Sequence, residues 1–150
     1  MQPSTVIYSE TLRPPLWLLA FIFFLLGSVA LAVWAAFDNR SGLIALIFSI
    51  AALPLINNAM LLRITLSDTE LRIGRAHIAR TYLGQAHVLT IDKMRLTRGR
   101  NADPTAYLAL RFWQPRGVKI DIRDARDSTP YWLISSKNAK GLVDALGSAR

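Results

Sequence analysis

Three aspartates and two histidines are the side chains of this sequence best suited to acid–base or metal chemistry. Asp121, Asp124 and Asp127 lie within the stretch KIDIRDARDS, where clustered carboxylates favour either cation binding or paired acid and base roles. Arginines are interleaved with them, so we interpret this stretch as a solvated edge that neutralises its own charge. His77 and His87 lack a regular metal-ligand spacing, and we expect half-buried strand histidines.

The hydroxyl nucleophiles come without an accompanying motif. Ser135 and Ser136 have no histidine or acid close to them in sequence, so a catalytic triad would depend entirely on contacts made by the fold. The chain has no cysteine, which excludes disulfides, thiolate nucleophiles and cysteine-based metal sites. No phosphate-binding loop signature occurs in it. We therefore predict no enzyme activity, no cofactor and no metal.

Two long uncharged runs, residues 15–37 and 42–62, dominate the first half of the chain. As a helix, the 23 residues of the first run would extend roughly 34 Å, enough to cross a bilayer core of about 30 Å. With the polar linker 38–41 between them, the runs predict a transmembrane helical hairpin over residues 15–62. A cleaved signal peptide is disfavoured, because the first run is too long and the second follows at once.

Basic residues flank the hairpin unequally and predict its orientation. Arg13 precedes the first run and four arginines follow the second within about 20 residues, whereas the linker contains only Arg40, beside Asp38. The positive-inside rule then places the N-terminal segment 1–14 and the C-terminal part 63–150 in the cytoplasm, with the hairpin in the membrane.

Small and amide side chains within the two runs are candidates for helix–helix contacts. Serine and alanine recur at every fourth position of the first run, a spacing that lets helices approach closely. In the second run Pro54 predicts a kink and is followed by two asparagines, whose amides can bond freed backbone or a partner helix. The candidate contact residues are Ser28, Ala32, Ala36, Asn57 and Asn58.

The sequence period changes to two after Leu62, which predicts short β-strands. RITL and LRIG flank a turn at SDTE, and YLALRFW and VKIDIRD flank a second turn at QPRG. About seven strand-like segments precede a terminal amphipathic helix, expected at about 138–147. We therefore predict an α+β protein whose residues 63–150 form a small antiparallel β domain, with the element order of a pleckstrin-homology-like barrel.

The segment DSTPYWLISSK, residues 127–137, combines a turn with two adjacent aromatic residues. Pro130 suits the first position of a strand, where its missing N–H does least harm. Tyr131 and Trp132 would then point to opposite faces of that strand. The pattern predicts the last strand of the domain rather than an active site, and the open question is what covers Trp132.

Positive charge is concentrated in the second half of the chain. The net charge of +8 comes from 18 lysines and arginines against 10 acids, and residues 63–150 carry all of it. Anionic lipid attracts such charge with about 1 kcal/mol per basic residue near the membrane surface. An acidic protein partner and a merely solvated face are the alternatives, and nucleic acid is disfavoured in a membrane-tethered domain without a recognised motif. The densest basic group is Lys93, Arg95, Arg98 and Arg100.

Four segments together resemble the DUF3093 family of actinobacterial membrane proteins: YSETLRPPLW, LRIGRAHI, DPTAYLALRFW and DSTPYWLIS. The resemblance covers nearly the whole chain and implies two membrane helices with a cytoplasmic domain. It implies no activity, ligand or catalytic residue. It marks as the first positions to test, whether for folding or function, Asp103, Pro104, Tyr107, Trp113, Asp127, Thr129, Pro130, Tyr131 and Trp132.

These observations favour one class of function over two others. We expect a non-enzymatic membrane-anchored interaction module, whose basic domain docks a protein partner, anionic lipid or both. The alternative is an accessory subunit of a larger membrane complex, held through the hairpin. The third class, a membrane-surface enzyme, would use the aspartate cluster or the histidines.

Overall fold

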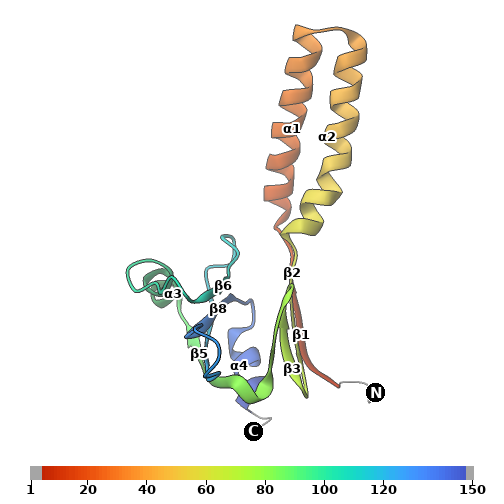
Figure 1. Ribbon diagram of the computed structural model, residues 1–150. Helices are drawn as coiled ribbons and strands as arrows, with labels where there is room; N and C mark the ends of the chain where they lie inside the picture. The colour runs from red at the N-terminus through yellow and green to blue at the C-terminus, as the bar shows by residue number, and fades with distance from the viewer. Residues whose placement is uncertain (1–4, 148–150) are drawn as a thin grey trace. The chain divides into compact units, whose positions relative to one another are not determined.

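The computed structural model describes residues 5–147, which form two compact units. One unit is the segment Arg13–Leu61, and the other combines the strand that precedes it with everything from Leu62 onward. In chain order the elements are β1 (Val6–Leu12), α1 (Leu16–Ala36), α2 (Asn39–Met60), β2 (Leu62–Ser67), β3 (Glu70–Ile73), β4 (Ala76–Ala79), η1 (Arg80–Tyr82), β5 (Leu83–Leu89), α3 (Ile91–Arg98), β6 (Tyr107–Ala109), β7 (Gly117–Ile122), β8 (Tyr131–Ser135) and α4 (Ala139–Gly147) (Figure 1).

The helices α1 and α2 form an antiparallel hairpin with a turn of two residues (Figure 1). The turn is capped by Asp38, whose Oδ1 accepts a hydrogen bond of 2.9 Å from the Ser41 N–H. The Trp34 indole N–H donates to Asn39 across the turn at 2.9 Å, and its ring lies so close to Gly42 that a Cβ there would clash with it. The connection is therefore a two-residue turn, shorter than the four-residue linker expected from the sequence, because α2 already begins at Asn39.

Few side chains of the hairpin are needed to hold its helices together. The half-buried and buried positions of α1 recur at intervals of three and four residues, as in a helix pair, and the Ser49 hydroxyl of α2 lies 3.2 Å from the carbonyl oxygen of Leu26 in α1. Large apolar side chains such as Phe24, Leu31 and Phe48 are exposed. Both helices are long and apolar enough to cross a membrane, and their exposure distinguishes them from core helices of a soluble protein.

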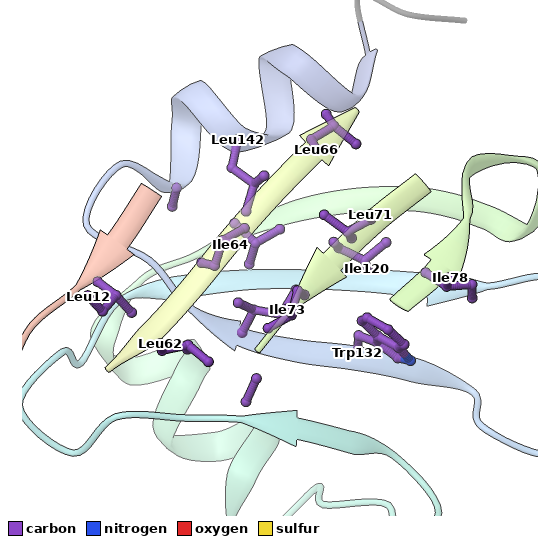
Figure 2. Close-up of a cluster of buried hydrophobic side chains, with 14 residues drawn as sticks. Leu12, Leu62, Ile64, Leu66, Leu71, Ile73, Ile78, Ile120, Trp132 and Leu142 are labelled. Atoms are coloured by element: carbon purple, nitrogen blue, oxygen red, sulfur yellow. The ribbon is translucent and has the colours of Figure 1, made fainter. Parts of the chain in front are cut away.

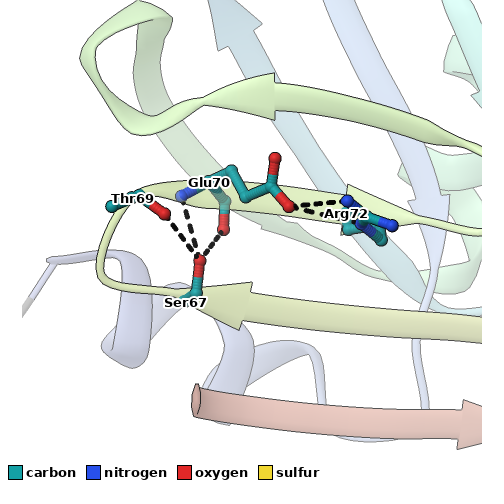
Figure 3. A network of polar contacts seen from close by, with 4 residues as sticks. All are labelled: Ser67, Thr69, Glu70 and Arg72. Carbon is teal, nitrogen blue, oxygen red and sulfur yellow. Dashed lines mark hydrogen bonds and ion pairs between the residues drawn. The ribbon is translucent and has the colours of Figure 1, made fainter. Parts of the chain in front are cut away.

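The second unit contains two four-stranded sheets, with the strand orders β1-β2-β3-β4 and β5-β7-β8-β6. The first sheet is antiparallel throughout, and its β2–β3 turn is held by the Ser67 hydroxyl, which bonds both the N–H and the carbonyl of Glu70 at 3.0 Å (Figure 3). The next turn contains Gly74 at φ 59°, a left-handed conformation that favours glycine. In the second sheet β6 runs parallel to β8, whereas the other pairs are antiparallel.

Two apolar clusters lie on opposite faces of the second sheet. The larger fills the space between the two sheets and α4, where Leu142 of α4 lies against Ile64 and Leu66 of β2 (Figure 2). The smaller contains Met94 of α3 together with Leu133 of β8. The second sheet is therefore covered on both faces, which explains why all five residues of β8 are buried.

The predicted α+β class is confirmed, but the predicted barrel of about seven strands is not. Within residues 5–147 no strand pairing joins the two sheets, so the ladder does not close into a barrel. An eighth strand, β1, comes from the segment before α1, and it pairs antiparallel with β2, so that Leu12 lies opposite Leu62. Residues 91–98 form α3, a helix that the predicted series of strands with one terminal helix did not include.

Candidate lipid-contact surface

The helix α3 presents the densest basic segment of the chain on the surface of the domain. It begins after Thr90 and ends at Gly99, and Asp92 in its first turn complements the helix dipole. Met94 is its one buried side chain, and it anchors α3 against the sheet. Because no other side chain of α3 is buried, charged residues can occupy four of its eight positions.

Basic and apolar side chains are mixed on the exposed part of α3. Leu96 is 48% exposed and lies two positions from Met94, on the opposite side of the helix. Lys93 and Arg95 flank it, and the predicted set is completed by Arg98 in the last turn and Arg100 just beyond the helix. No ion pair within residues 5–147 engages any of these four cations. All four cations of the predicted group are exposed, and their contact with lipid or a partner stays a prediction.

The two segments DPTAY and TPYW come together in the structure. Tyr107 and Trp132 are register partners on the parallel strands β6 and β8, with ring centroids 4.7 Å apart. The Tyr131 hydroxyl accepts a hydrogen bond of 3.2 Å from the Asp103 N–H. Asp103 in turn accepts from the Thr105 hydroxyl at 2.6 Å, which holds the pKa of this exposed carboxyl below its usual value. These contacts assign both segments a structural role in joining β6 to β8.

The question of what covers Trp132 is answered by the main core. Trp132 is 6% exposed and lies in the cluster between the two sheets, as Figure 2 shows. Tyr131 faces the other cluster, with Lys119 Nζ 4.6 Å from its ring centroid. Before the strand, the carbonyl oxygen of Pro130 accepts a hydrogen bond of 3.0 Å from the Ile122 N–H. The last-strand prediction for this segment is therefore confirmed by β8.

The remaining marked residues lie in the turn before β8 and in the loops on either side of β6, with Pro104 before β6 and Trp113 after it. Asp127 accepts hydrogen bonds from the Thr129 hydroxyl and N–H, which lower the pKa of that carboxyl. Pro104 is exposed in the loop. The indole nitrogen of Trp113 is buried without a hydrogen-bond partner among the described residues, and the Trp113 ring packs edge-on against Phe112 with centroids 5.0 Å apart.

The acids and histidines singled out by their chemistry do not converge on one centre. Asp121 lies 3.4 Å from Lys119 and 3.8 Å from His87, whereas Asp124 pairs with Arg126. His77 lines an open cavity of about 360 Å³ with Asp124 and Asp127. Among the described residues no group of three histidine or acidic side chains is placed to hold a metal ion.

Both candidate serines act as structural hydrogen-bonding groups in buried positions. The Ser135 hydroxyl accepts from the Arg111 N–H at 3.0 Å and donates to the Gln114 carbonyl at 3.1 Å. The Ser136 hydroxyl donates to Glu10 at 2.7 Å. Neither serine is hydrogen-bonded to a histidine in the part of the chain that the structure describes, so the geometry provides no serine triad.

A carboxylate that the sequence analysis did not single out joins the two ends of the domain. Glu10 of β1 accepts hydrogen bonds from the Tyr8 hydroxyl at 2.9 Å, from Ser136 and from the Lys137 N–H at 2.6 Å. It thereby ties the first strand to the turn that begins α4. Burial, the hydrogen bond to Glu10 and its negative charge together raise the pKa of Tyr8 to about 12.

This raised pKa predicts a loss of stability in alkali. An unfolded tyrosine ionises near pH 10, whereas Tyr8 keeps its proton in the native state up to about pH 12. The native state therefore binds more protons between these values, and the free energy of unfolding falls as the pH rises through them. Thermal unfolding at a series of pH values should show this fall, and Tyr8→Phe should reduce its slope. An unchanged slope in Tyr8→Phe would contradict the prediction.

The candidate contact residues of the hairpin lie mainly outside the α1–α2 contact. Ser28, Ala32 and Ala36 are exposed in the hairpin, and the Ser28 hydroxyl bonds the Phe24 carbonyl of its own helix at 2.8 Å. Asn57 is half-buried, and the exposed Asn58 accepts the Leu61 N–H through its carbonyl oxygen at 3.3 Å. The Ser49 hydroxyl of α2 does lie at the contact, 3.2 Å from the Leu26 carbonyl oxygen of α1.

A basic cavity adjoining α3 also escaped the sequence analysis. It has a volume of about 450 Å³ and lies between the first residues of α3 and those of α4. Arg116, Lys137 and Lys140 line it, together with Asp92. Arg116 precedes β7, whereas Lys137 and Lys140 follow β8, so these cations are separated in sequence by two strands. The sequence offered only the short PRG and SSKNAK segments as hints of them.

Fold and surface define a class: an α+β protein that joins a pair of long, exposed apolar helices to a basic two-sheet domain. A family model described as Protein of unknown function (DUF3093) matches residues 7–146. The chain therefore belongs to the DUF3093 family, as the four sequence segments suggested. Neither a curated protein nor a solved structure matches it.

Proposed function

We propose that this protein is a membrane-anchored interaction module whose α3 surface contacts anionic lipid. The hairpin α1–α2 is the anchor, and the two-sheet domain is held at the membrane surface by short links. The observation that carries the proposal is the exposed surface of α3, where Leu96 projects between Lys93 and Arg95. Apolar and basic groups mixed in this way suit the headgroup region of a bilayer. The same surface would bring the domain to a protein partner at the membrane.

The anchor role is supported by the exposed apolar helices and by the strand that precedes them. Burying their large apolar side chains in lipid removes them from water, and the helical backbone satisfies its own hydrogen bonds. A cleaved signal peptide is disfavoured on new grounds, because removal of α1 would also remove β1 from the first sheet. The pairing of β1 with β2 also supports an even number of crossings, since both ends of the hairpin lead into one sheet.

The positive-inside rule extends the proposal to the orientation of the chain in a bacterial plasma membrane. The chain has no cysteine, so single cysteines report their location without background. In intact bacterial cells, a membrane-impermeant maleimide should label Asn39→Cys in the α1–α2 turn and spare Ser128→Cys in the domain. After cell lysis both positions should react. Labelling of only Ser128→Cys in intact cells would invert the proposed orientation.

Lipid contact by α3 can be measured with an environment-sensitive fluorophore on Leu96→Cys in the full-length protein. In nanodiscs containing phosphatidylglycerol, the emission should shift to the blue relative to discs of phosphatidylcholine alone. Lipid-attached spin labels should quench it in the anionic discs. The double variant Arg95→Gln/Arg98→Gln should lower the equilibrium constant for contact between α3 and anionic lipid roughly 30-fold, since each basic residue contributes about 1 kcal/mol near an anionic surface.

A matched charge change on the first sheet provides the control for this experiment. Arg72→Gln/Arg75→Gln removes the same net charge from β3 and the turn after it, and it should retain the blue shift. A fluorophore on Asp68→Cys, in the β2–β3 turn, should report water in both kinds of disc. The proposal fails if Leu96→Cys emits identically in neutral and anionic discs, or if both double variants abolish the shift equally.

A further inference from the structure

We propose that the cavity between the first turns of α3 and α4 binds a phosphate monoester carried on a short apolar group. This site goes beyond the lipid contact of α3, because its cations are different residues and it recognises one group rather than a charged surface. Its cations are Arg116, before β7, and Lys137 and Lys140, at the start of α4.

The charge of the cavity suits a dianion. Its three cations face one carboxylate, Asp92, which leaves two positive charges. Within residues 5–147 none of these cations belongs to an ion pair, and the nearby Glu10 is already engaged by Tyr8, Ser136 and the Lys137 N–H. A phosphate monoester carries between about 1.5 and 2 negative charges at neutral pH, and Arg116 offers it a planar pair of donors. A carboxylate would neutralise only half of this charge.

The cavity also has apolar walls, which a phosphate ion alone would leave uncovered. Val88 and Ile91 line it and are 46% and 43% exposed, so apolar area there is open to a ligand. The volume of about 450 Å³ falls in the range of small-molecule sites and exceeds what a phosphate group fills. A ligand that places its phosphate among the cations and an apolar group against Val88 and Ile91 satisfies both parts.

The two helix ends at the cavity are not equivalent. At α4, Asn138 accepts a hydrogen bond from the Gly141 N–H at 3.1 Å and so caps the helix. At α3, Thr90 makes no side-chain cap. The amides in the first turn of α3 therefore retain hydrogen-bonding capacity toward a bound anion, and they add to the attraction of the three side-chain cations.

The four lysines of the chain allow the site to be tested by protection from acylation. Full-length protein in phosphatidylcholine nanodiscs would be treated with an amine-reactive reagent, with and without hexyl phosphate, and modification followed by mass spectrometry. At a ligand concentration ten times the dissociation constant, acylation of Lys137 and Lys140 should slow about tenfold. Lys93 and Lys119 lie outside the cavity and should react at unchanged rates. Hexyltrimethylammonium, with the opposite charge, should protect none of them.

Two substitutions separate the cavity from the α3 surface. Arg116→Gln should weaken hexyl phosphate about tenfold while leaving the α3 lipid contact unchanged. Lys93→Gln, the matched loss of one charge on α3, should leave hexyl phosphate affinity unchanged. Thermal unfolding of each variant verifies that the fold persists. If the unsubstituted protein shows no lipid contact at α3 but hexyl phosphate still protects Lys137 and Lys140, only the lipid proposal is overturned. If lipid contact occurs but the two lysines are not protected, only the cavity proposal is overturned.

The source of the phosphate is distinguished by changing the disc lipid. Phosphatidic acid presents a phosphate monoester, whereas phosphatidylglycerol presents a diester in a comparably anionic surface. Protection of Lys137 and Lys140 in phosphatidic acid discs without added ligand identifies a lipid headgroup, and protection only by hexyl phosphate identifies a soluble ligand. Equal protection in both anionic discs, protection by inorganic phosphate as strong as by hexyl phosphate, or no protection in any arm would overturn the proposal.

Discussion

Replacing Trp132 with alanine is expected to lower the free energy of unfolding of the domain by about 3–5 kcal/mol. Trp132 is 6% exposed, it lies between the two sheets, and its ring packs against Tyr107 at 4.7 Å. Its removal would leave a large cavity lined by side chains of both sheets, which the rigid β8 cannot close. Hydrogen exchange of the β7 and β8 amides in lipid nanodiscs measures the loss without interference from the hairpin.

Phe112 offers a control of the same chemistry in a different environment. It is 64% exposed, so Phe112→Ala should change the free energy of unfolding by no more than about 0.5 kcal/mol. A functional rather than structural role for Trp132 would be indicated if Trp132→Ala changed stability as little as Phe112→Ala does.

The substitution Glu10→Ala should cost about 2–4 kcal/mol, because three donors lose a charged acceptor at once. The Ser136 hydroxyl is fully buried and would lose the carboxylate to which it donates. The effect should appear at both ends of the domain, as faster hydrogen exchange in β1 and in the first turn of α4. Combining Glu10→Ala with Ser136→Ala should cost less than the sum of the single changes, since the buried donor is then gone.

Glu70→Ala is the matched control for Glu10→Ala. Glu70 pairs with Arg72 at 2.9 Å across one exposed face of β3 (Figure 3), and such surface pairs contribute no more than about 1 kcal/mol. Equal losses from Glu10→Ala and Glu70→Ala would show that the junction between β1 and α4 does not stabilise the domain.

The features visible in the sequence were those with a strong local signal. Long uncharged runs located both hairpin helices to within three residues, and alternation located β8 and its entry turn. The terminal helix was expected at about 138–147 and occurs at Ala139–Gly147, because Asn138 is a good cap and leucines recur on one face. In each case the information that determines the element lies within the element itself.

The missed features depend on partners far away in the chain. The segment VIYSETL, which forms β1, shows no clear alternation of apolar and polar residues, because apolar residues also occupy exposed positions. Its partner β2 begins only after the whole hairpin. The helix α3 has a single buried side chain, Met94, so its sequence shows no apolar stripe. The parallel pairing of β6 with β8 has no local signature in the sequence.

The candidate sites also divide into one with a local signal in the sequence and others that depend on contacts between distant segments. Lys93, Arg95, Arg98 and Arg100 are neighbours in sequence, so the high positive charge of this segment is visible without the fold. Arg116 and Lys140 become neighbours only because β7 and β8 are paired, which brings the turn before one strand next to the turn after the other. Glu10 gains its role only when β1 joins the sheet.

The position of β1 ahead of the hairpin has a consequence for biosynthesis. During translation β1 leaves the ribosome first, but its partner β2 follows only after all residues of α1 and α2. The first sheet therefore remains incomplete until the hairpin has been synthesised, and Glu10 can meet Ser136 only after β8 has been made. The first sheet can therefore be completed only after both helices have been synthesised. If the proposed membrane insertion failed and left β1 on the other side of the bilayer, β2 would lack its partner and become an edge strand.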